Sequence, residues 1–163
     1  MLTIRTAAAA DQPQLMAIYR TAQEYMLQTG NPTQWGRSYP SPELIRSDIA
    51  QGICRVLSDE AGIHGVLALL DTPEPTYSRK EGAWRNDAPY LTIHRLAGDG
   101  RTHGLFRCRG LLQGHFPECS SGYPRRQPHH AAFAGRERLP PCGTIHVRDG
   151  TPRLAYHWTA DRP

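Results

Sequence analysis

The sequence predicts an α+β (mixed α/β) fold. Apolar residues recur at helical spacing between Asp11 and Gly30, and two apolar runs at 53–58 and 63–70 are separated by a turn sequence. A third apolar run at 90–97 ends in a glycine-rich turn. The chain has 163 residues, the length of one domain with a single hydrophobic core. We therefore expect one domain over residues 1–163.

The first predicted elements are a strand and two helices. Residues 2–6 alternate as a strand does. Asp11 is suited to cap a helix that has Pro13 in its first turn and ends at Gly30. Residues 41–50 predict a second, short helix. The apolar positions of the two helices are Leu15, Ile18, Ala22, Met26, and then Leu44, Ile45 and Ile49.

Strands dominate the rest of the predicted fold. The runs 53–58 and 63–70 flank Asp-Glu-Ala-Gly, which predicts an antiparallel hairpin. Residues 71–88 are polar and predicted to be irregular, whereas 90–97 is rich in aromatic and β-branched residues and predicts a strand. The runs 143–147 and 153–158 flank Arg-Asp-Gly-Thr and predict a closing hairpin.

The turn after residues 90–97 has the features of an anion site. Gly98, Gly100 and Gly104 lead from the strand into the expected first turn of a helix. The free N–H groups and the positive dipole end of a helix N-terminus both point toward a phosphate bound there. A plain turn between strand and helix has the same pattern, so this motif alone leaves both interpretations open.

The charge of the chain does not indicate a nucleic-acid partner. The net charge is +4, yet residues 107–141 hold six arginines and two glutamates, which leaves 13 basic and 13 acidic residues elsewhere. A nucleic-acid module would depend on arginines of that one stretch. They are Arg125, Arg126, Arg136 and Arg138.

Composition and residue spacing also give expectations for the cellular location and for metal binding. The longest apolar run, residues 66–70, is too short for a signal peptide or a membrane span, and we expect a cytoplasmic protein. The four cysteines are irregularly spaced, which favours reduced thiols over disulfides. We expect no metal, because the candidate zinc ligands fit no standard spacing. These candidates are Cys119, His129, His130 and Cys142.

The order of elements and the turn sequence together resemble the GNAT superfamily of N-acetyltransferases. The resemblance covers residues 1–106 and 142–158. The family's acyl-CoA signature is Arg or Gln, two residues, Gly, one residue, then Gly or Ala. Arg101, Gly104 and Phe106 occupy its three positions, and Phe106 departs from the usual small residue. The resemblance implies a central, mostly antiparallel sheet flanked by helices, in one acyltransferase-like domain interrupted at 107–141.

The resemblance further implies that acetyl-CoA binds as co-substrate, without a metal. Backbone N–H groups of the glycine turn would cradle its pyrophosphate, and the last residues of the preceding strand would lie beside the pantetheine arm. The implied cofactor-binding residues are Leu96, Ala97, Arg101, Thr102, His103, Gly104, Leu105 and Phe106.

The family transfers acetyl directly from the thioester to an amine. That step needs a base for the ammonium proton and an acid for the leaving thiolate. His94 is the candidate base, because its ordinary pKa suits neutral pH, and Tyr156 is the candidate acid. Packing roles are the simpler interpretation of both. Candidates for lining the acceptor groove, which can equally be ordinary core or rim aromatics, are Tyr25, Trp35, Tyr77 and Trp84.

The implied partner is a small-molecule or peptide amine. The sequence favours neither kind of amine, and no nucleic-acid or membrane partner is expected. A homodimer is left open. The alternative to an enzyme is a non-catalytic acyl-CoA-binding protein, or a pseudo-enzyme, of the same fold.

Residues 107–141 do not fit the family pattern. The family has the rest of the cofactor helix, a strand and another helix there. In this chain five prolines and four glycines interrupt the stretch, and no apolar periodicity persists. We expect residues 107–141 to be irregular or poorly ordered. A disordered insertion is one explanation.

A shifted reading frame over residues 108–141 is another explanation. Reading the coding DNA one base later limits Gln113 to Lys or Arg and His115 to Ile or Thr. One permitted translation from Cys108 onward is A-A-D-F-C-K-G-I-F-P-N-V-R-V-D-T-H-A-D-N-R-T-M-Q-H-L-L-E-x-N-G-F. It contains a helix, an alternating strand, an Asn cap, an amphipathic helix and an Asn-Gly turn, in the family's order. We interpret the stretch as a one-base insertion near codon 108 with a compensating deletion near codon 141, which would impair folding or activity.

Overall fold

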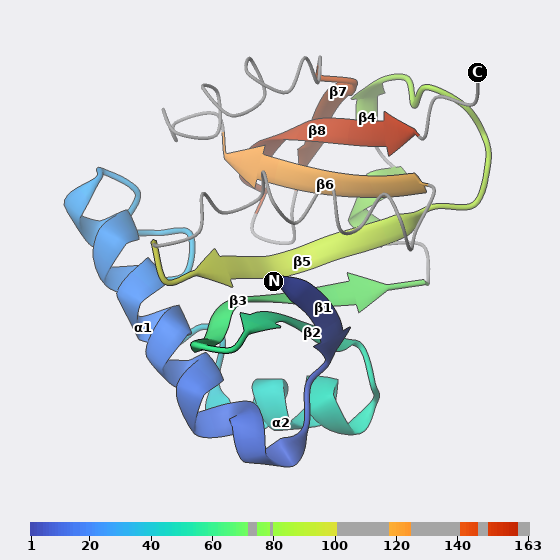
Figure 1. Cartoon of the computed structure of the whole chain (residues 1–163). Helices are drawn as coiled ribbons and strands as arrows, with labels where there is room; N and C mark the ends of the chain where they lie inside the picture. The colour runs from blue at the N-terminus through green and yellow to red at the C-terminus, as the bar shows by residue number, and fades with distance from the viewer. Residues whose placement is uncertain (72–74, 79, 101–117, 125–140, 147–149, 160–163) are drawn as a thin grey trace. The chain divides into compact units, whose positions relative to one another are not determined.

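The computed structural model describes residues 1–71, 75–78, 80–100, 118–124, 141–146 and 150–159 (Figure 1). The chain divides into two compact units. Unit 1 is Met1–Leu69 with His94–Leu112, and unit 2 is Leu70–Ile93 with Gln113–Pro163. Each unit is described by itself below. The expectation of a single domain stays a prediction.

The two helices of unit 1 confirm the sequence prediction. A 3-10 turn, η1 (Ala9–Asp11), leads into α1 (Gln12–Gln28), and a loop connects α1 to α2 (Pro42–Ala50). Asp11 occupies the N-cap position of α1, but its carboxylate binds the Arg5 guanidinium at 2.7 and 3.0 Å instead of capping the helix. The Ser41 hydroxyl caps α2 and accepts from the Leu44 N–H at 3.2 Å.

The first three strands of unit 1 form an antiparallel meander. β1 (Thr3–Thr6) pairs with β2 (Cys54–Asp59), and β2 pairs with β3 (Gly62–Leu70). β5 (Leu91–Gly98) follows β3 in the sheet order and gives His94–Gly98 to this unit. The β2–β3 turn is the predicted one: the Asp59 carboxylate accepts from the Ala61 N–H at 2.8 Å.

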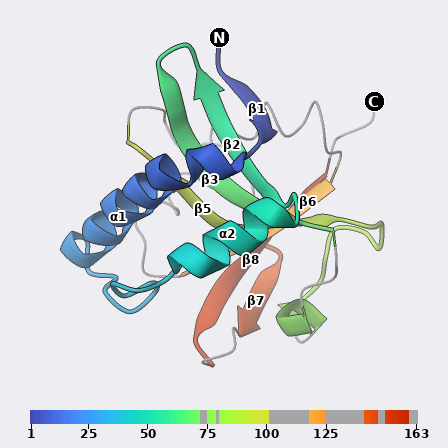
Figure 2. The ribbon, with the colours of Figure 1, turned by 90° about the horizontal axis from the view of Figure 1, so that it is seen from below.

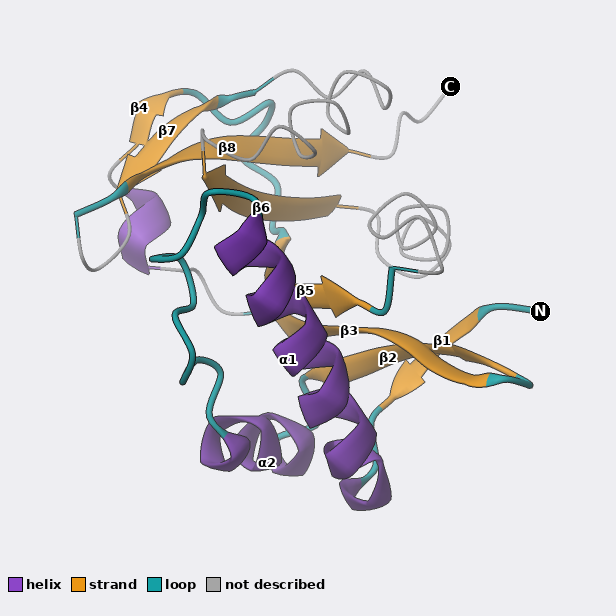
Figure 3. Ribbon diagram, turned by 90° about the vertical axis from the view of Figure 1, so that its left-hand side faces the viewer, coloured by secondary structure: helices purple, strands orange, loops and turns teal. Residues whose placement is uncertain are grey.

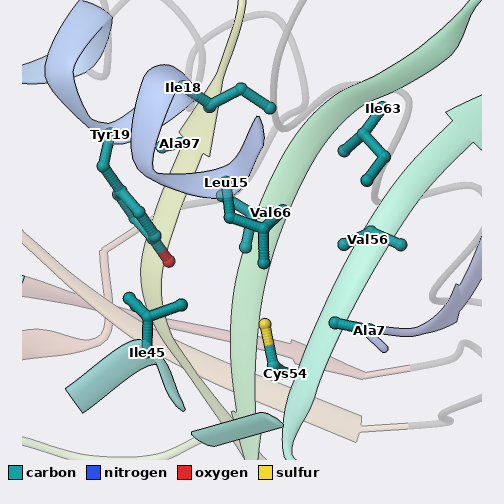
Figure 4. Packing of buried hydrophobic residues seen from close by; sticks show 10 residues of the cluster. All are labelled: Ala7, Leu15, Ile18, Tyr19, Ile45, Cys54, Val56, Ile63, Val66 and Ala97. Atoms are coloured by element: carbon teal, nitrogen blue, oxygen red, sulfur yellow. The ribbon is translucent and has the colours of Figure 1, made fainter. Parts of the chain in front are cut away.

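Helices α1 and α2 lie on one face of these strands (Figure 2). Leu15, Ile18 and Tyr19 of α1 and Ile45 of α2 are almost fully buried. They pack on Val66 of β3 and other strand residues (Figure 4), as the apolar face of an amphipathic helix does. The rest of this cluster is Ala7, Cys54, Val56, Ile63 and Ala97.

Unit 2 holds the remaining strands; Figure 3 draws all the strands in orange and labels each of them. β6 (Glu118–Pro124) pairs in parallel with the Leu91 and Thr92 end of β5. β8 (Pro152–Thr159) pairs antiparallel with both β6 and β7 (Gly143–His146), and β4 (Lys80–Gly82) pairs antiparallel with β7. A 3-10 turn, η2 (Pro75–Ser78), precedes β4.

These pairings confirm the α+β fold with mostly antiparallel strands and flanking helices. The closing hairpin is β7 and β8, as predicted. No helix among the described residues is long and apolar enough to cross a membrane.

Two strands were not predicted. β4 lies within residues 71–88, which the sequence indicated as irregular, and β6 lies within 107–141. Neither has an alternating apolar pattern, so both are defined by backbone pairing with their neighbours. β4 approaches β7 closely where Gly82 faces Gly143, because a Cβ on either would collide with the opposite backbone.

Candidate functional site

Arg95 of β5 lies at the centre of a buried polar network in unit 1. Its Nε donates to Oδ2 of Asp48 on α2 at 2.9 Å, and its Nη2 lies 2.8 Å from the same oxygen. Its Nη1 donates to the Tyr39 hydroxyl at 3.3 Å. The side chains of Arg95 and Asp48 are only 10% and 4% exposed. Burial raises the pKa of the Asp48 carboxyl, and the Arg95 charge opposes that rise.

The backbone at Arg95 departs from the strand around it. Its φ is +50°, a left-handed conformation that costs about 1–3 kcal/mol for a residue other than glycine. The buried Tyr19 hydroxyl donates to the Arg95 carbonyl at 3.0 Å and so helps to hold this conformation. Strained backbone held by its surroundings is typical of sites where a ligand approaches a strand.

Aromatic side chains of the α1–α2 loop surround this network. Trp35 packs edge-on against Tyr19 at 5.7 Å and against Tyr39 at 6.3 Å between ring centroids. The Gln23 side chain of α1 donates to the Tyr39 carbonyl at 2.8 Å and fixes the end of the loop. Tyr39 itself remains 39% exposed. Its ring can therefore contact both the network and a ligand.

A second polar cluster marks the start of the glycine turn that follows β5. His64 of β3 lies between Asp59, the last residue of β2, and Asp99, directly after β5. Gly100 has φ of +79°, which favours glycine and turns the chain sharply before residue 101. The described residues contain no group of three His, Cys, Asp or Glu side chains arranged to hold a metal ion.

Unit 2 contains an aromatic cluster around His157 of β8. The buried His157 ring lies 5.5 Å from Trp84 and 5.8 Å from Tyr90, and its Nδ1 accepts from the Arg85 N–H at 3.1 Å. Lys80 sits 5.0 Å over the Trp84 ring, in a cation–π contact. Tyr77 packs 5.8 Å from Trp84.

Solved structures share this architecture. A GNAT-family acetyltransferase from Streptococcus agalactiae matches 99% of this chain and 96% of its own, with 25% identity and a TM-score of 0.86. The chain has the GNAT acetyltransferase fold. A GNAT acetyltransferase from Listeria monocytogenes, 16% identical, matches 97% of this chain and 94% of its own with a TM-score of 0.66. No family model and no curated protein matches the sequence.

One structure of the same fold contains coenzyme A. It is the PaiA N-acetyltransferase from Thermoplasma acidophilum in complex with coenzyme A. That protein is 14% identical, and the match covers 98% of this chain and 99% of the other with a TM-score of 0.64. The resemblance to the GNAT superfamily inferred from the sequence is thereby confirmed at the level of the fold.

In this GNAT fold, part of the predicted cofactor site lies on β5. Ala97 is buried, and its side chain packs in the core of unit 1 (Figure 4), so only its backbone can face a ligand. Leu96 and His94 are half-buried on the same strand. The predicted pyrophosphate residues, Arg101, Thr102, His103, Gly104, Leu105 and Phe106, lie outside the described residues.

The other predicted site residues fall in both units. Tyr25 of α1 is 43% exposed, and half-buried Trp35 lies in the aromatic loop of unit 1. Tyr77 and Trp84 pack in the small core of unit 2. Tyr156 of β8 is 9% exposed, and burial raises the pKa of its hydroxyl. The roles assigned to these residues stay predictions.

Sequence reasoning missed the network of Arg95, Asp48 and Tyr39. One signal was present: a charged residue in the middle of an apolar strand needs a buried partner. Asp48 among the apolar positions of the second helix is the matching acidic signal. His64 within an apolar strand is a third signal of this kind.

Proposed function

We propose that this protein is an N-acetyltransferase that moves acetyl from acetyl-CoA directly to a primary amine. The observation that carries the proposal is the match to a GNAT acetyltransferase over 99% of the chain, with a TM-score of 0.86 and 25% identity. The acceptor is a small-molecule or peptide amine. Neither a nucleic acid nor a membrane is part of the proposal, and a homodimer and a cytoplasmic location remain compatible with it.

The proposed acetyl-CoA site begins at the end of β5. Its pantetheine arm would lie beside Leu96 and Ala97, and its pyrophosphate would be held by backbone N–H groups from Arg101 to Phe106. Two observations support this: the left-handed backbone at Arg95 and the coenzyme A complex of a protein with the same fold. No metal takes part in the proposed chemistry.

The transfer step needs proton movements at two atoms. A base removes a proton from the acceptor ammonium, the amine nitrogen attacks the thioester carbonyl carbon, and the carbon–sulfur bond breaks. The leaving thiolate then takes a proton, and the nitrogen loses its second proton as the neutral amide forms. We propose His94 as the base, acting directly or through water, and Tyr156 as the acid. Tyr25, Trp35, Tyr77 and Trp84 are the proposed acceptor-lining residues.

We also propose that this chain is impaired because residues 108–141 are read in a shifted frame. A one-base insertion followed by a compensating one-base deletion keeps the number of codons. Each residue from 108 to 141 can therefore be compared with the residue at the same position of the restored translation. The restored translation carries N-V-R-V-D-T-H at residues 118–124, which are the residues of β6. An alternating pattern in the restored frame thus coincides with an observed strand.

The residues present in β6 are unfavourable for an inner strand of a sheet. β6 pairs with β5 on one side and with β8 on the other, so it is an inner strand. Its sequence, Glu-Cys-Ser-Ser-Gly-Tyr-Pro, contains a glycine and a proline, and a proline cannot donate to either neighbouring strand. The restored translation has neither a glycine nor a proline at the positions of β6.

Turnover with a panel of amines tests the proposed activity. Release of free coenzyme A from acetyl-CoA is measured for this chain and for a frame-restored chain, in which residues 108–141 carry the shifted-frame translation. We expect amine-dependent release from the frame-restored chain and much slower release from this one. Binding of acetyl-CoA without turnover in both chains would instead identify a non-catalytic acyl-CoA-binding protein.

Sequencing the gene tests the frame shift itself. We expect the shifted frame between codons 108 and 141 to encode a string close to the restored translation. Nucleotides that encode an unrelated string in that frame would refute the frame shift and leave a true insertion as the explanation.

A further inference from the structure

Arg95 is the only residue other than glycine with a positive φ in the part of the chain that the structure describes. It lies inside β5, and the strand continues on both sides of it. A side chain with a Cβ disfavours this conformation, because the Cβ approaches the following carbonyl oxygen too closely. Contacts from other elements must therefore hold the backbone of Arg95 in place.

Three segments of unit 1 supply these contacts. The Tyr19 hydroxyl of α1 donates to the Arg95 carbonyl at 3.0 Å, and the Asp48 carboxylate of α2 accepts from Nε of Arg95 at 2.9 Å. The Tyr39 hydroxyl of the α1–α2 loop accepts from Nη1 at 3.3 Å. One contact holds the backbone of Arg95 and two hold its side chain. We call Tyr19, Asp48 and Tyr39 the anchor residues of Arg95.

Tyr19 and Asp48 are rigid enough to hold a strained residue. Both are almost fully buried, and the Tyr19 ring belongs to the hydrophobic cluster of unit 1 (Figure 4). Hydrogen bonds in such surroundings are stronger than at the surface, because the local dielectric is low. Side chains that are locked by packing can keep a site within the narrow tolerances that ligand binding requires.

The anchor residues also set the direction of the next peptide group. The peptide between Arg95 and Leu96 is trans, so its C=O and N–H point in opposite directions. Because the carbonyl points toward Tyr19, the Leu96 N–H points away from it. The Ala97 side chain packs in the core, so this end of β5 offers a ligand mainly its backbone. The pantetheine arm carries amide groups, which need backbone donors and acceptors in defined directions.

We propose that Tyr19 and Asp48 are positioning residues for acyl-CoA: they hold Arg95 in its left-handed conformation and so direct the backbone of Leu96 and Ala97 toward the pantetheine arm. This inference rests on the proposed function. Neither Tyr19 nor Asp48 contacts the ligand, and both act through Arg95. Without them, residue 95 returns to an extended conformation and coenzyme A binds more weakly.

Glycine at position 95 distinguishes this role from simple packing. Glycine adopts a positive φ about as readily as a negative one, so it keeps the left-handed backbone without anchor residues. Alanine also lacks the guanidinium, but its Cβ disfavours the left-handed region. A packing role predicts the opposite ranking of the two variants, because glycine weakens a strand relative to alanine.

The test measures coenzyme A affinity by calorimetry, on this chain and on the frame-restored chain. Arg95→Ala and Arg95→Gly are each combined with Asp48→Asn, so that no buried carboxylate is left without its cation. Tyr19→Phe is made alone and together with the glycine variant. The matched controls are Arg55→Ala and Arg55→Gly, because Arg55 lies within β2 and its φ is not positive. Circular dichroism checks that each variant is folded.

We expect the alanine variant at position 95 to bind coenzyme A about tenfold more weakly than the unsubstituted protein. The glycine variant should bind about threefold more tightly than the alanine variant. Tyr19→Phe alone should weaken binding about threefold, and it should have almost no further effect in the glycine variant, because glycine needs no anchor residues. The two Arg55 variants should bind equally well.

Crystal structures of the two Arg95 variants give a second readout, the φ of residue 95. We expect a positive φ in the glycine variant and a negative φ in the alanine variant. A positive φ in the alanine variant would overturn this inference, because the left-handed backbone would then not depend on the anchor residues. Affinities of the two variants within about twofold of each other, or tighter binding by the alanine variant, would also overturn it and leave the proposed function standing. Absence of coenzyme A binding to the unsubstituted form of both chains would overturn both.

Discussion

At the scale of single residues, the pair Arg95–Asp48 should be the most sensitive polar contact of unit 1. Both side chains are buried, and Asp48 accepts a hydrogen bond from Nε of Arg95 and pairs with its Nη2 at 2.8 Å. Removing one partner of such a pair leaves an uncompensated buried charge. We predict that Asp48→Ala lowers the free energy of unfolding by about 3–5 kcal/mol, measured by urea denaturation.

The control for this prediction is Glu24→Ala. Glu24 is exposed on α1, and its loss should change the free energy of unfolding by no more than about 0.5 kcal/mol. Equal effects of the two substitutions would contradict a special role for the buried pair.

The His64 cluster predicts a dependence of stability on pH. Hydrogen bonds to Asp99 and Asp59 raise the pKa of His64 in the folded chain, so its contribution to stability is fully present below the unfolded pKa of about 6.5. That contribution is lost as the pH rises through the higher, folded pKa. We predict that the difference in unfolding free energy between the unsubstituted protein and His64→Gln shrinks from pH 6 to pH 8.5. A constant difference over that range would show that His64 is neutral in the fold.

Individual residues were predicted from the sequence only where they belong to a local motif. The turn at Asp59 was predicted, because a turn is set by neighbours in the chain, whereas the Ser41 cap of α2 was not predicted and the predicted cap, Asp11, binds Arg5 instead. The partnership of Arg95 with Asp48 joins a strand to a helix 47 residues away. Such a contact exists only after the elements have packed, and no local pattern specifies it.

At the scale of elements, α2 is short enough that its cap should matter. A nine-residue helix has few internal hydrogen bonds, and the Ser41 hydroxyl satisfies one of its free N–H groups. We predict that Ser41→Ala costs about 1 kcal/mol of unfolding free energy, measured by thermal and urea denaturation.

Ser47→Ala is the matched control, because it removes the same hydroxyl from an exposed position inside α2. Alanine has the higher helix propensity there, so this variant should be neutral or slightly stabilising. A loss of stability in Ser47→Ala equal to that in Ser41→Ala would mean that capping is not the cause.

Helices and strands whose apolar residues recur with a clear periodicity were predicted with nearly correct boundaries. The two helices and the strands β1, β2, β3 and β5 differ from the sequence prediction by one or two residues. β4 has three residues and no period, and its glycine is required by backbone approach to β7. β6 lacks the alternation of an inner strand, which is what the frame shift would produce.

At the scale of the whole molecule, the restored reading frame should stabilise the chain. It replaces the glycine and proline of an inner strand and returns apolar residues at roughly 1.5–3 kcal/mol each when buried. We predict that the frame-restored chain unfolds cooperatively, with a midpoint higher than that of this chain by roughly 10 °C or more. Scanning calorimetry measures both. Equal midpoints, with equal upward shifts on adding acetyl-CoA, would show that this chain is not impaired.

We propose that the turn after β5 holds acyl-CoA in a GNAT fold. Calorimetric titration of coenzyme A into the frame-restored chain and its Gly104→Asp variant tests it most directly. We predict saturable binding of one coenzyme A per chain and its loss in Gly104→Asp, because a carboxylate in a phosphate-binding loop repels the ligand. No binding to the frame-restored chain, or equal binding to the variant, would contradict it.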